Sequence, residues 1–325
     1  MSQDPFVAQT YLKHFGDPKA GGMLHAYRKT DGAEFPCWPK DVCTEWEGDL
    51  NDAFPDRPGL LGDYRKIFEP HWNPAVQTVL QGSIGASEKF VLSAYMANLM
   101  VCTPAWRRVG QKIYRDGHVG VLKFRHEMAE KHGRGDQLLK EGIDLLDKGH
   151  LKIEIDPSYI KAQVTRSLMN YACMMYNLDW TIVGNDTEQP FVTSDNPVAM
   201  AYSGQPGDPM TRFLPITPRL CLSVRMRGES VARLTPEDVR KIMSAPPRGR
   251  VYRADARPVG VTESNKLIVQ CAEELVFSSM ADTGIRELTK KYAGYRIDTD
   301  QLEVRKKSEP NAIYQGFSLR VKEVS

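Results

Sequence analysis

The sequence predicts an α+β protein, because strand-like and helical segments are grouped along the chain and do not alternate regularly. Residues 1–82 are rich in Gly, Pro and aromatic side chains, residues 83–178 have the apolar spacing of helices, and residues 179–325 mix both patterns. A doubly wound parallel sheet would require regular alternation of strands and helices. A chain of 325 residues is long enough for one large domain, and we expect these three sub-regions to form one.

The first sub-region, 1–82, contains a predicted β-hairpin. Two short strand-like runs, 23–27 and 34–38, flank the dipeptide Asp31-Gly32, and Asp-Gly between such runs favours a tight hairpin turn. Residues 64–72 are predicted to form a short helix that ends before Pro74, because the residue before a proline avoids the helical region.

The middle sub-region, 83–178, is predicted to be helical. Ser83 or Ser87 caps a first helix, and Thr103-Pro104 ends it and begins the next, since Thr is a good N-cap and Pro suits the first helical position. Asp156-Pro157 begins a long helix in the same way. Between them, separate helical segments are expected at roughly 119–131 and 135–148.

The last sub-region, 179–325, is predicted to mix strands and short helices. Residues 180–183 and 191–193 are expected to pair as strands around a turn at 184–189. Residues 219–226 alternate between apolar and polar side chains, as a half-buried strand does. Helices are expected to begin near Thr235 and Thr262, and strands are expected between residues 295 and 324.

The composition excludes several classes of protein. Lys and Arg total 43 against 41 Asp and Glu, so the formal charge of +2 is too small for a protein that coats nucleic acid. The start of the chain lacks the basic and apolar pattern of a secretory signal, and the most apolar windows, 90–102 and 168–178, are too short to span a bilayer. Six cysteines lie far apart, so we expect a reducing, cytoplasmic location without disulfides.

The segment Thr193-Ser194-Asp195-Asn196-Pro197 is the strongest candidate for a functional site. It follows a predicted buried strand and brings together two hydroxyls, a carboxylate and an amide. A carboxylate in this position can bind Mg²⁺ or Mn²⁺ or act as a general base. The alternative is purely structural, because Asp and Asn hydrogen-bond to the backbone that follows them in Asx-turns.

Other candidate sites have weaker patterns. Glu69, His71 and Trp72 place a carboxylate, an imidazole and an indole within four positions, although a solvated helix end explains them as well. His126 and Glu130 share a helical face, but the sequence has Glu at 130 where a zinc protease motif needs His. The spacing of the cysteines does not fit a zinc site, and the sequence has neither a P-loop nor a Rossmann glycine motif.

Basic residues gather in two places. The first group is Arg107, Arg108, Lys112 and Arg115, on one predicted helix. The second group is Arg248, Arg250, Arg253 and Arg257, around Tyr252. Arg side chains bind phosphate oxygens and Tyr can stack on a base, so these groups indicate a nucleotide or nucleic-acid ligand if they share a face. Solvated surface positions are the alternative, and Arg107 could instead pair with a buried carboxylate such as Asp195.

Several segments together resemble a bacterial family known as domain of unknown function 4238. The segments that carry the resemblance are 5–15, 39–45, 102–107, 191–198, which reads F-V-T-S-D-N-P-V, and 214–218, followed by a helix with Asn265. The family opens with the pattern H-Y-V-P-x-F-Y-L, whereas this chain has Pro5 in place of the histidine and Ala8 in place of the following proline. The resemblance implies a fold and a region of interest, not a reaction.

Two functions follow from these patterns. The first is a metal-assisted hydrolase that acts on a phosphodiester or nucleotide. Its catalytic residues would be Asp195, Asn196 and Glu69, and its substrate-binding residues Arg107, Ser194 and Thr193, with Mg²⁺ or Mn²⁺ as a possible cofactor. The second is a non-catalytic protein that binds or senses a nucleotide, a nucleic acid or a protein partner. A structural role for every motif is a third reading.

Overall fold

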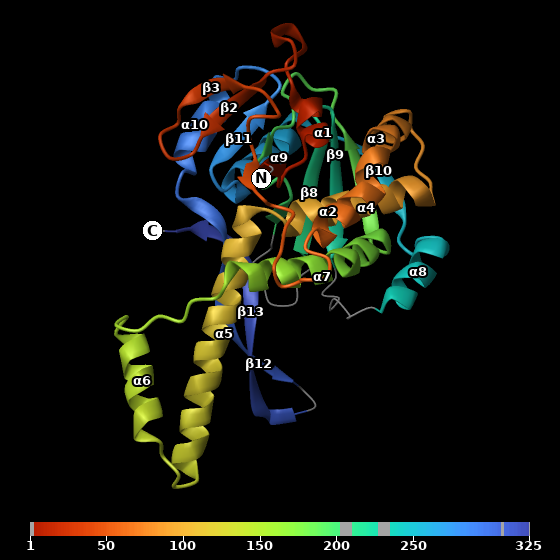
Figure 1. Cartoon of the computed structure of the whole chain (residues 1–325). Helices are drawn as coiled ribbons and strands as arrows, with labels where there is room; N and C mark the ends of the chain where they lie inside the picture. Colours follow the sequence, from red (N-terminus) through yellow and green to blue (C-terminus); the bar gives the residue numbers. More distant parts are fainter. Residues whose placement is uncertain (1–2, 202–209, 227–234, 307–308, 325) are drawn as a thin grey trace.

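The computed structural model describes residues 3–201, 210–226, 235–306 and 309–324 of the chain. Among these residues, the strands form a five-stranded sheet, a four-stranded sheet and two two-stranded pairs, with helices packed around them (Figure 1). Helices and strands are grouped along the chain and do not alternate regularly, so the predicted α+β class is confirmed.

The five-stranded sheet carries most of the residues discussed below. In spatial order its strands are β10 (Val251–Asp255), β5 (Asp179–Gly184), β9 (Leu220–Met226), β8 (Met210–Thr217) and β7 (Ala199–Ala201). β10 lies parallel to β5, and the other neighbours are antiparallel. In β9, Leu222 and Val224 are buried whereas Arg225 is exposed, which confirms the strand predicted at 219–226.

The four-stranded sheet has the order β3 (Glu34–Cys37), β2 (Leu24–Arg28), β11 (Leu275–Ser278) and β6 (Thr193–Ser194). β2 and β3 form the predicted hairpin, in which Gly32 has a φ of +67° that favours glycine. The predicted pairing of 180–183 with 191–193 is wrong. β5 pairs with β9 and β10, and β6 pairs with β11, because the partners that bury these strands come from distant parts of the sequence.

Helices α4 (Ala86–Val101) and α7 (Pro157–Tyr176) share one core with the buried face of the five-stranded sheet. Beyond them lie α1 (Gln9–Leu12), α2 (Leu60–Phe68) and α3 (Trp72–Leu80). The ring of Trp72 in α3 stacks on that of Tyr95 in α4 with centroids 3.9 Å apart. Pro74 does not end a helix as predicted, because it lies in the first turn of α3, where no intrahelical N–H is needed.

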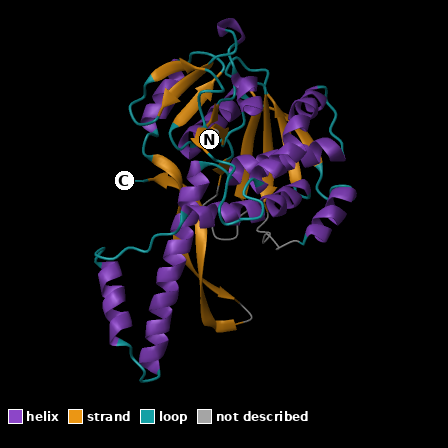
Figure 2. Cartoon of the chain, in the orientation of Figure 1, coloured by secondary structure: helices purple, strands orange, loops and turns teal. Residues whose placement is uncertain are grey.

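An arm projects from the body of the molecule (Figures 1 and 2). It contains α5 (Pro104–Lys131), α6 (Gln137–Asp147) and the paired strands β12 (Tyr295–Lys306) and β13 (Glu309–Glu323). We expected a helix break between residues 115 and 119, but α5 is continuous over 28 residues. Gly117 does not break this helix, because one glycine weakens a helix by only about 1 kcal/mol.

The other helices lie around the two sheets, and the two remaining strands pair with each other in a separate two-stranded sheet. The helices are α8 (Pro236–Ser244), α9 (Pro258–Cys271) and α10 (Thr283–Lys291), and the strands are β1 (Gln3–Pro5) and β4 (Thr44–Trp46). In α9, Val261 packs with Phe191 and Cys221, so α9 covers only one end of the second face of the five-stranded sheet. Within the described ranges, no helix combines the length and apolar character needed to cross a membrane. All six cysteines are free thiols.

The loop before β10 is held against the end of α7 by a buried lysine. Lys89 is 1% exposed, and its Nζ donates to the carbonyl oxygens of Leu178 (2.9 Å) and Gly249 (2.7 Å). Burial lowers the pKa of Lys89 to about 8. A Cβ atom at Gly249 would lie 1.9 Å from the carbonyl oxygen of Leu178, so only glycine lets these two backbones approach.

Replacing Gly249 with Ala should therefore lower the free energy of unfolding by about 3 kcal/mol, because backbone and not a flexible side chain would have to move. The matched control is Gly260→Ala in α9, where no atom lies within 4 Å of an added Cβ. We expect that control to be neutral or to stabilise by up to about 1 kcal/mol. Urea denaturation measures both changes, and equal effects of the two substitutions would contradict this account of Gly249.

Candidate functional site

The carboxylate of Asp195 binds the backbone of the turn between α9 and β11, residues 271–275. Its oxygens accept hydrogen bonds from the N–H groups of Glu273 (2.9 Å), Glu274 (2.7 Å) and Leu275 (3.0 Å). The N–H of Asp195 donates in return to the carbonyl of Leu275, at 3.0 Å. Asp195 is only 5% exposed, so these bonds take the place of water around the carboxylate.

The carbonyl groups at the end of α9 are bound by two other side chains. Nδ2 of Asn196 donates to the carbonyl of Cys271, and Nζ of Lys29 donates to that of Ala272, both at 2.8 Å. A cation near the C-terminus of a helix also interacts favourably with the helix dipole. Oδ1 of Asn196 accepts from the hydroxyl of Thr103 (3.0 Å), the residue just before α5. The α9–β11 turn is therefore tied to β2, β6 and α5.

The hydroxyls of Thr193 and Ser194 also have protein partners. The hydroxyl of Tyr11 donates to the carbonyl of Pro215 (2.6 Å), so its single proton is used there and Thr193 must donate to Tyr11, at 2.7 Å. Ser194 Oγ accepts from the N–H of Asn196 at 3.2 Å. This local bond is a Ser-to-backbone turn contact, whereas Asp195 binds a distant turn and not the backbone that follows it, as an Asx-turn would require.

Burial shifts the pKa values of the charged groups in this region. The pKa of Asp195 is raised to about 6, chiefly by loss of water, although the three N–H groups of the turn oppose the shift. The pKa of Lys29, which is 1% exposed, is lowered to about 8 by burial and is partly restored by the charge of Asp195. At pH 7 the carboxylate of Asp195 is therefore negative and the amine of Lys29 positive. The N–H and carbonyl groups of the turn stabilise these two charges.

Arg107 and Glu69 lie in other contacts. Arg107 pairs with Glu45, with Nη1 2.6 Å from Oε2, and not with Asp195. Glu69 lies directly after α2, and its pKa is raised overall, because the effect of burial exceeds the opposing effect of the positive charge of Arg65. No hydrogen bond or ion pair in the described part of the chain joins Asp195 to either residue. The structure thus brings Thr193, Ser194, Asp195 and Asn196 together, and their catalytic and binding roles stay predictions.

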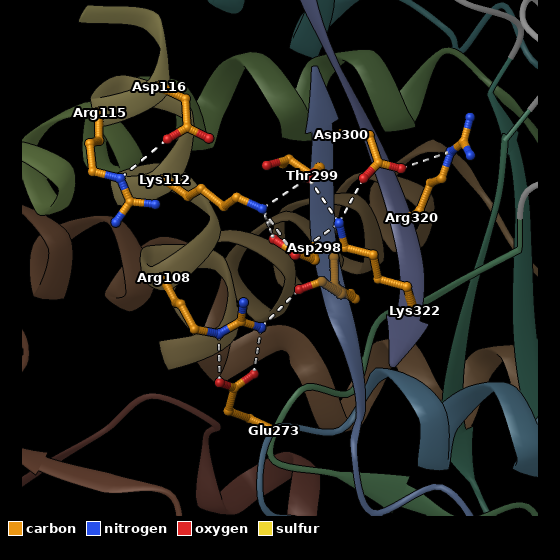
Figure 3. Close-up of polar contacts among 11 residues, drawn as sticks. Arg108, Lys112, Arg115, Asp116, Glu273, Asp298, Thr299, Asp300, Arg320 and Lys322 are labelled. Carbon is orange, nitrogen blue, oxygen red and sulfur yellow. Dashed lines mark hydrogen bonds and ion pairs between the residues drawn. The ribbon is translucent and has the colours of Figure 1, made fainter. Parts of the chain in front are cut away.

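The first basic group is paired within the molecule (Figure 3). Arg108 binds Glu273 through two hydrogen bonds of 2.8 and 3.0 Å and also donates to the carbonyl of Ile297 at 2.8 Å. Arg115 pairs with its neighbour Asp116 at 3.2 Å. Because Glu273 belongs to the α9–β11 turn, Arg108 connects that turn to the arm.

Further along α5, Lys112 binds the base of the β12–β13 ribbon. Its Nζ donates to both oxygens of Asp298 (2.9 and 3.0 Å) and to the carbonyl of Thr299 (3.0 Å). Lys322 in β13 binds the same carboxylate at 3.1 Å. These bonds lower the pKa of Asp298 against the opposing effect of its burial. Arg108 and Lys112 of this group therefore connect α5 to the α9–β11 turn and to the ribbon.

A hollow of about 310 Å³ lies on the open end of the five-stranded sheet. It is lined by Asp179, Thr181, Thr211, Ser223, Arg225 and Tyr252. These side chains share a face because Arg225 lies opposite Asp179 and Thr211 in the register, and Thr181 lies opposite Ser223 and Tyr252. Arg225 forms no ion pair with a residue that the structure describes. Sequence reasoning singled out Tyr252 but not Arg225 or the hydroxyls, since their proximity depends on strand order.

In the second basic group, Arg253 and the neighbouring Tyr252 point to opposite faces of the sheet. Arg253 donates to the carbonyl of Val79 in α3, at 2.9 Å, so its side chain lies on the helix-covered side. Tyr252, the preceding residue, is 48% exposed and lines the hollow. Arg250 lies next to this edge, where its N–H donates to Oδ1 of Asp179 at 2.9 Å.

Metal-ligating side chains are scattered. Over the described ranges, no three His, Cys, Asp or Glu residues are arranged to hold a metal ion. His126 Nδ1 is buried without a hydrogen-bond partner, but in the described part of the chain it does not belong to a group of three metal-ligating side chains. A site for Mg²⁺ or Mn²⁺ at Asp195 would need water or substrate for most of its ligands.

Substitution of Asp195 by Asn should lower the free energy of unfolding by about 3 kcal/mol. The amide retains one acceptor oxygen but points N–H donors at the donors of the turn, which leaves buried groups unsatisfied. Chemical denaturation at pH 7 measures the change, with Asp186→Asn on the exposed loop after β5 as the control, expected within about 0.5 kcal/mol of wild type. A difference below about 1 kcal/mol for Asp195→Asn would contradict the anchoring role.

The stability difference between wild type and Asp195→Asn should also depend on pH. The folded pKa of about 6 lies above the reference value of 3.8, so the folded state binds a proton more tightly and gains stability as pH falls through this interval. The excess stability of wild type should grow by about 1 kcal/mol between pH 7 and pH 5. An excess that shrinks over this range would show that the pKa of Asp195 is not raised.

Comparisons with known proteins identify the family of this chain. The profile of the family described as "Protein of unknown function (DUF4238)" matches residues 6–282, which include the α9–β11 turn and the hollow. The chain is also similar to "Uncharacterized protein MJ1673" of Methanocaldococcus jannaschii, with 30% identity over 94 residues, or 29% of this chain and 72% of that protein. No solved structure matches the chain. The resemblance inferred from the sequence is confirmed, and the chain belongs to the DUF4238 family.

Proposed function

We propose that this protein binds a nucleotide in the hollow on the five-stranded sheet, without converting it chemically. The observation that carries the proposal is the convergence of Arg225, Tyr252 and hydroxyl side chains on one hollow of about 310 Å³. This volume lies in the range of small-molecule sites in proteins. The ligand would combine a phosphate group with a planar base, because the lining offers a partner for each.

The phosphate and the base of a nucleotide each have a partner in the hollow. The exposed guanidinium of Arg225 can bind two phosphate oxygens, and the hydroxyls of Thr211 and Ser223 beside it can donate to the same group. The ring of Tyr252 offers a face on which a base can stack.

Hydrolysis of a phosphodiester or nucleotide at Asp195 is a second candidate function. The raised pKa of Asp195, about 6, is suited to a general base. However, both carboxylate oxygens already accept backbone hydrogen bonds, and Arg107 pairs with Glu45. The non-catalytic reading therefore has the stronger support, and the predicted roles of Asn196, Glu69, Ser194 and Thr193 belong to the hydrolase alternative.

Isothermal titration with the four nucleoside monophosphates tests the proposed binding. Arg225→Met should raise the dissociation constant about tenfold or more by removing a charge-assisted bond of about 1.5 to 3 kcal/mol. Tyr252→Ala should raise it about tenfold, since stacking on one base is worth about 1 to 3 kcal/mol. The control is Arg253→Met, because Arg253 follows Tyr252 but lies on the opposite face, and it should leave affinity within about twofold.

Two results would contradict the proposal. One is that no nucleotide binds wild type, and the other is that Arg225→Met and Arg253→Met weaken binding equally. The same mixtures, supplied with Mg²⁺ or Mn²⁺, are analysed for hydrolysis products. Turnover that persists in Arg225→Met and is lost in folded Asp195→Asn would favour the hydrolase over the binding protein.

A further inference from the structure

Arg212 in β8 places a guanidinium in the interior with no protein partner. The residue is 3% exposed, and its Nε and Nη1 atoms are buried without a hydrogen bond. It forms no ion pair with any residue in the described ranges. Across the sheet it lies opposite Met200 and Val224, which are apolar and buried. A cationic group is therefore enclosed by side chains that cannot accept hydrogen bonds from it.

The charge of this guanidinium is not neutralised by its surroundings. Burial lowers the pKa of Arg212, with small opposing effects from Cys271 and Tyr171, but a guanidinium remains protonated in proteins. Burial raises the pKa of Cys271 to about 11, so its thiol is neutral at pH 7. An ion removed from water without a counter-ion costs several kcal/mol, and buried charges in stable proteins have a partner.

A second donor without a protein partner lies beside this guanidinium. Tyr171 in α7 and Arg212 are close enough that each affects the pKa of the other. The Tyr171 hydroxyl makes no hydrogen bond to another described residue, while its ring packs edge-on against Trp106 with centroids 6.4 Å apart. The Trp106 contact orients the ring, and the hydroxyl adds a second hydrogen-bonding group beside Arg212.

We propose that Arg212 and Tyr171 bind a small oxyanion, a carboxylate or a phosphate, between β8 and α7. The fork of a guanidinium matches two oxygens of either group, and a phenol donates a third hydrogen bond. The positive charge of Arg212 disfavours a cation at the same place. Side chains alternate between the two faces along β8, so Arg212 lies on the same face as Leu214 of the main core. Thr211 lies on the opposite face, where it lines the hollow. This site is thus separate from the proposed nucleotide site and does not depend on it.

Thermal unfolding of the full chain with added anions tests this inference. Inorganic phosphate and acetate are compared with sodium chloride at equal ionic strength. At a concentration tenfold above the dissociation constant, either oxyanion should raise the unfolding midpoint of wild type by about 2 °C. Arg212→Met should abolish that rise, and Tyr171→Phe should reduce it. Arg286→Met, which changes an exposed arginine in α10, is the matched control and should keep the full rise.

The response to each anion identifies the ligand. A rise with phosphate alone identifies a phosphate group, a rise with acetate alone a carboxylate, and a rise with both a general oxyanion site. Arg212→Met should also unfold at a higher temperature than wild type without added oxyanion, because it removes an unpaired buried charge. The inference is overturned if neither oxyanion shifts wild type, or if the shift is equal in wild type and Arg212→Met. If Arg212→Met does not fold, Tyr171→Phe decides, and an undiminished shift in it overturns the site.

Discussion

The carboxylate of Asp195 accepts hydrogen bonds from three consecutive N–H groups, those of Glu273, Glu274 and Leu275, in the turn between α9 and β11. Without it the buried N–H of Glu273 would have no acceptor, at a cost of about 1 to 3 kcal/mol, and the part-buried N–H groups of Glu274 and Leu275 would lose theirs. The turn joins β11 of the four-stranded sheet to α9, which packs on the five-stranded sheet. The two sheets share an apolar core, and at the turn between them one buried anion and the Asn196 and Lys29 side chains satisfy the backbone N–H and carbonyl groups.

The same turn is also connected to the arm formed by α5 and the β12–β13 ribbon. The side chain of Glu273 extends from the turn and forms an ion pair with Arg108 at the base of α5 (Figure 3). Arg108 also donates a hydrogen bond to the carbonyl of Ile297. Lys112 and Asp298 extend this connection along the arm. The family match ends at residue 282, so the β12–β13 ribbon, which supplies Ile297 and Asp298, lies beyond it. Arg108 and Lys112 of α5 thus act as connectors between the turn and the arm.

How much the sequence could predict depends on the range of the interactions. The hairpin around Asp31-Gly32 and the alternation in 219–226 are local patterns, and both were confirmed. The bonds of Asp195 join residues 78 to 80 positions apart, so the sequence could indicate a turn-forming carboxylate but not which turn it binds. Tyr252 and Arg225 share a hollow only because β5 lies between β10 and β9. Arg212 appears in the sequence as an ordinary strand residue, and only its burial without a partner distinguishes it.

Hydrogen exchange resolved to single amides tests the role of Asp195 most directly. If the carboxylate anchors the turn, the amides of Glu273, Glu274 and Leu275 exchange at pH 7 as slowly as that of Phe277, in the adjoining strand β11, since all open only in global unfolding. In Asp195→Asn, under conditions where it stays folded, these three amides should exchange much faster while Phe277 remains protected. Fast exchange of the three amides in wild type, at the rate of an exposed loop, would contradict the account.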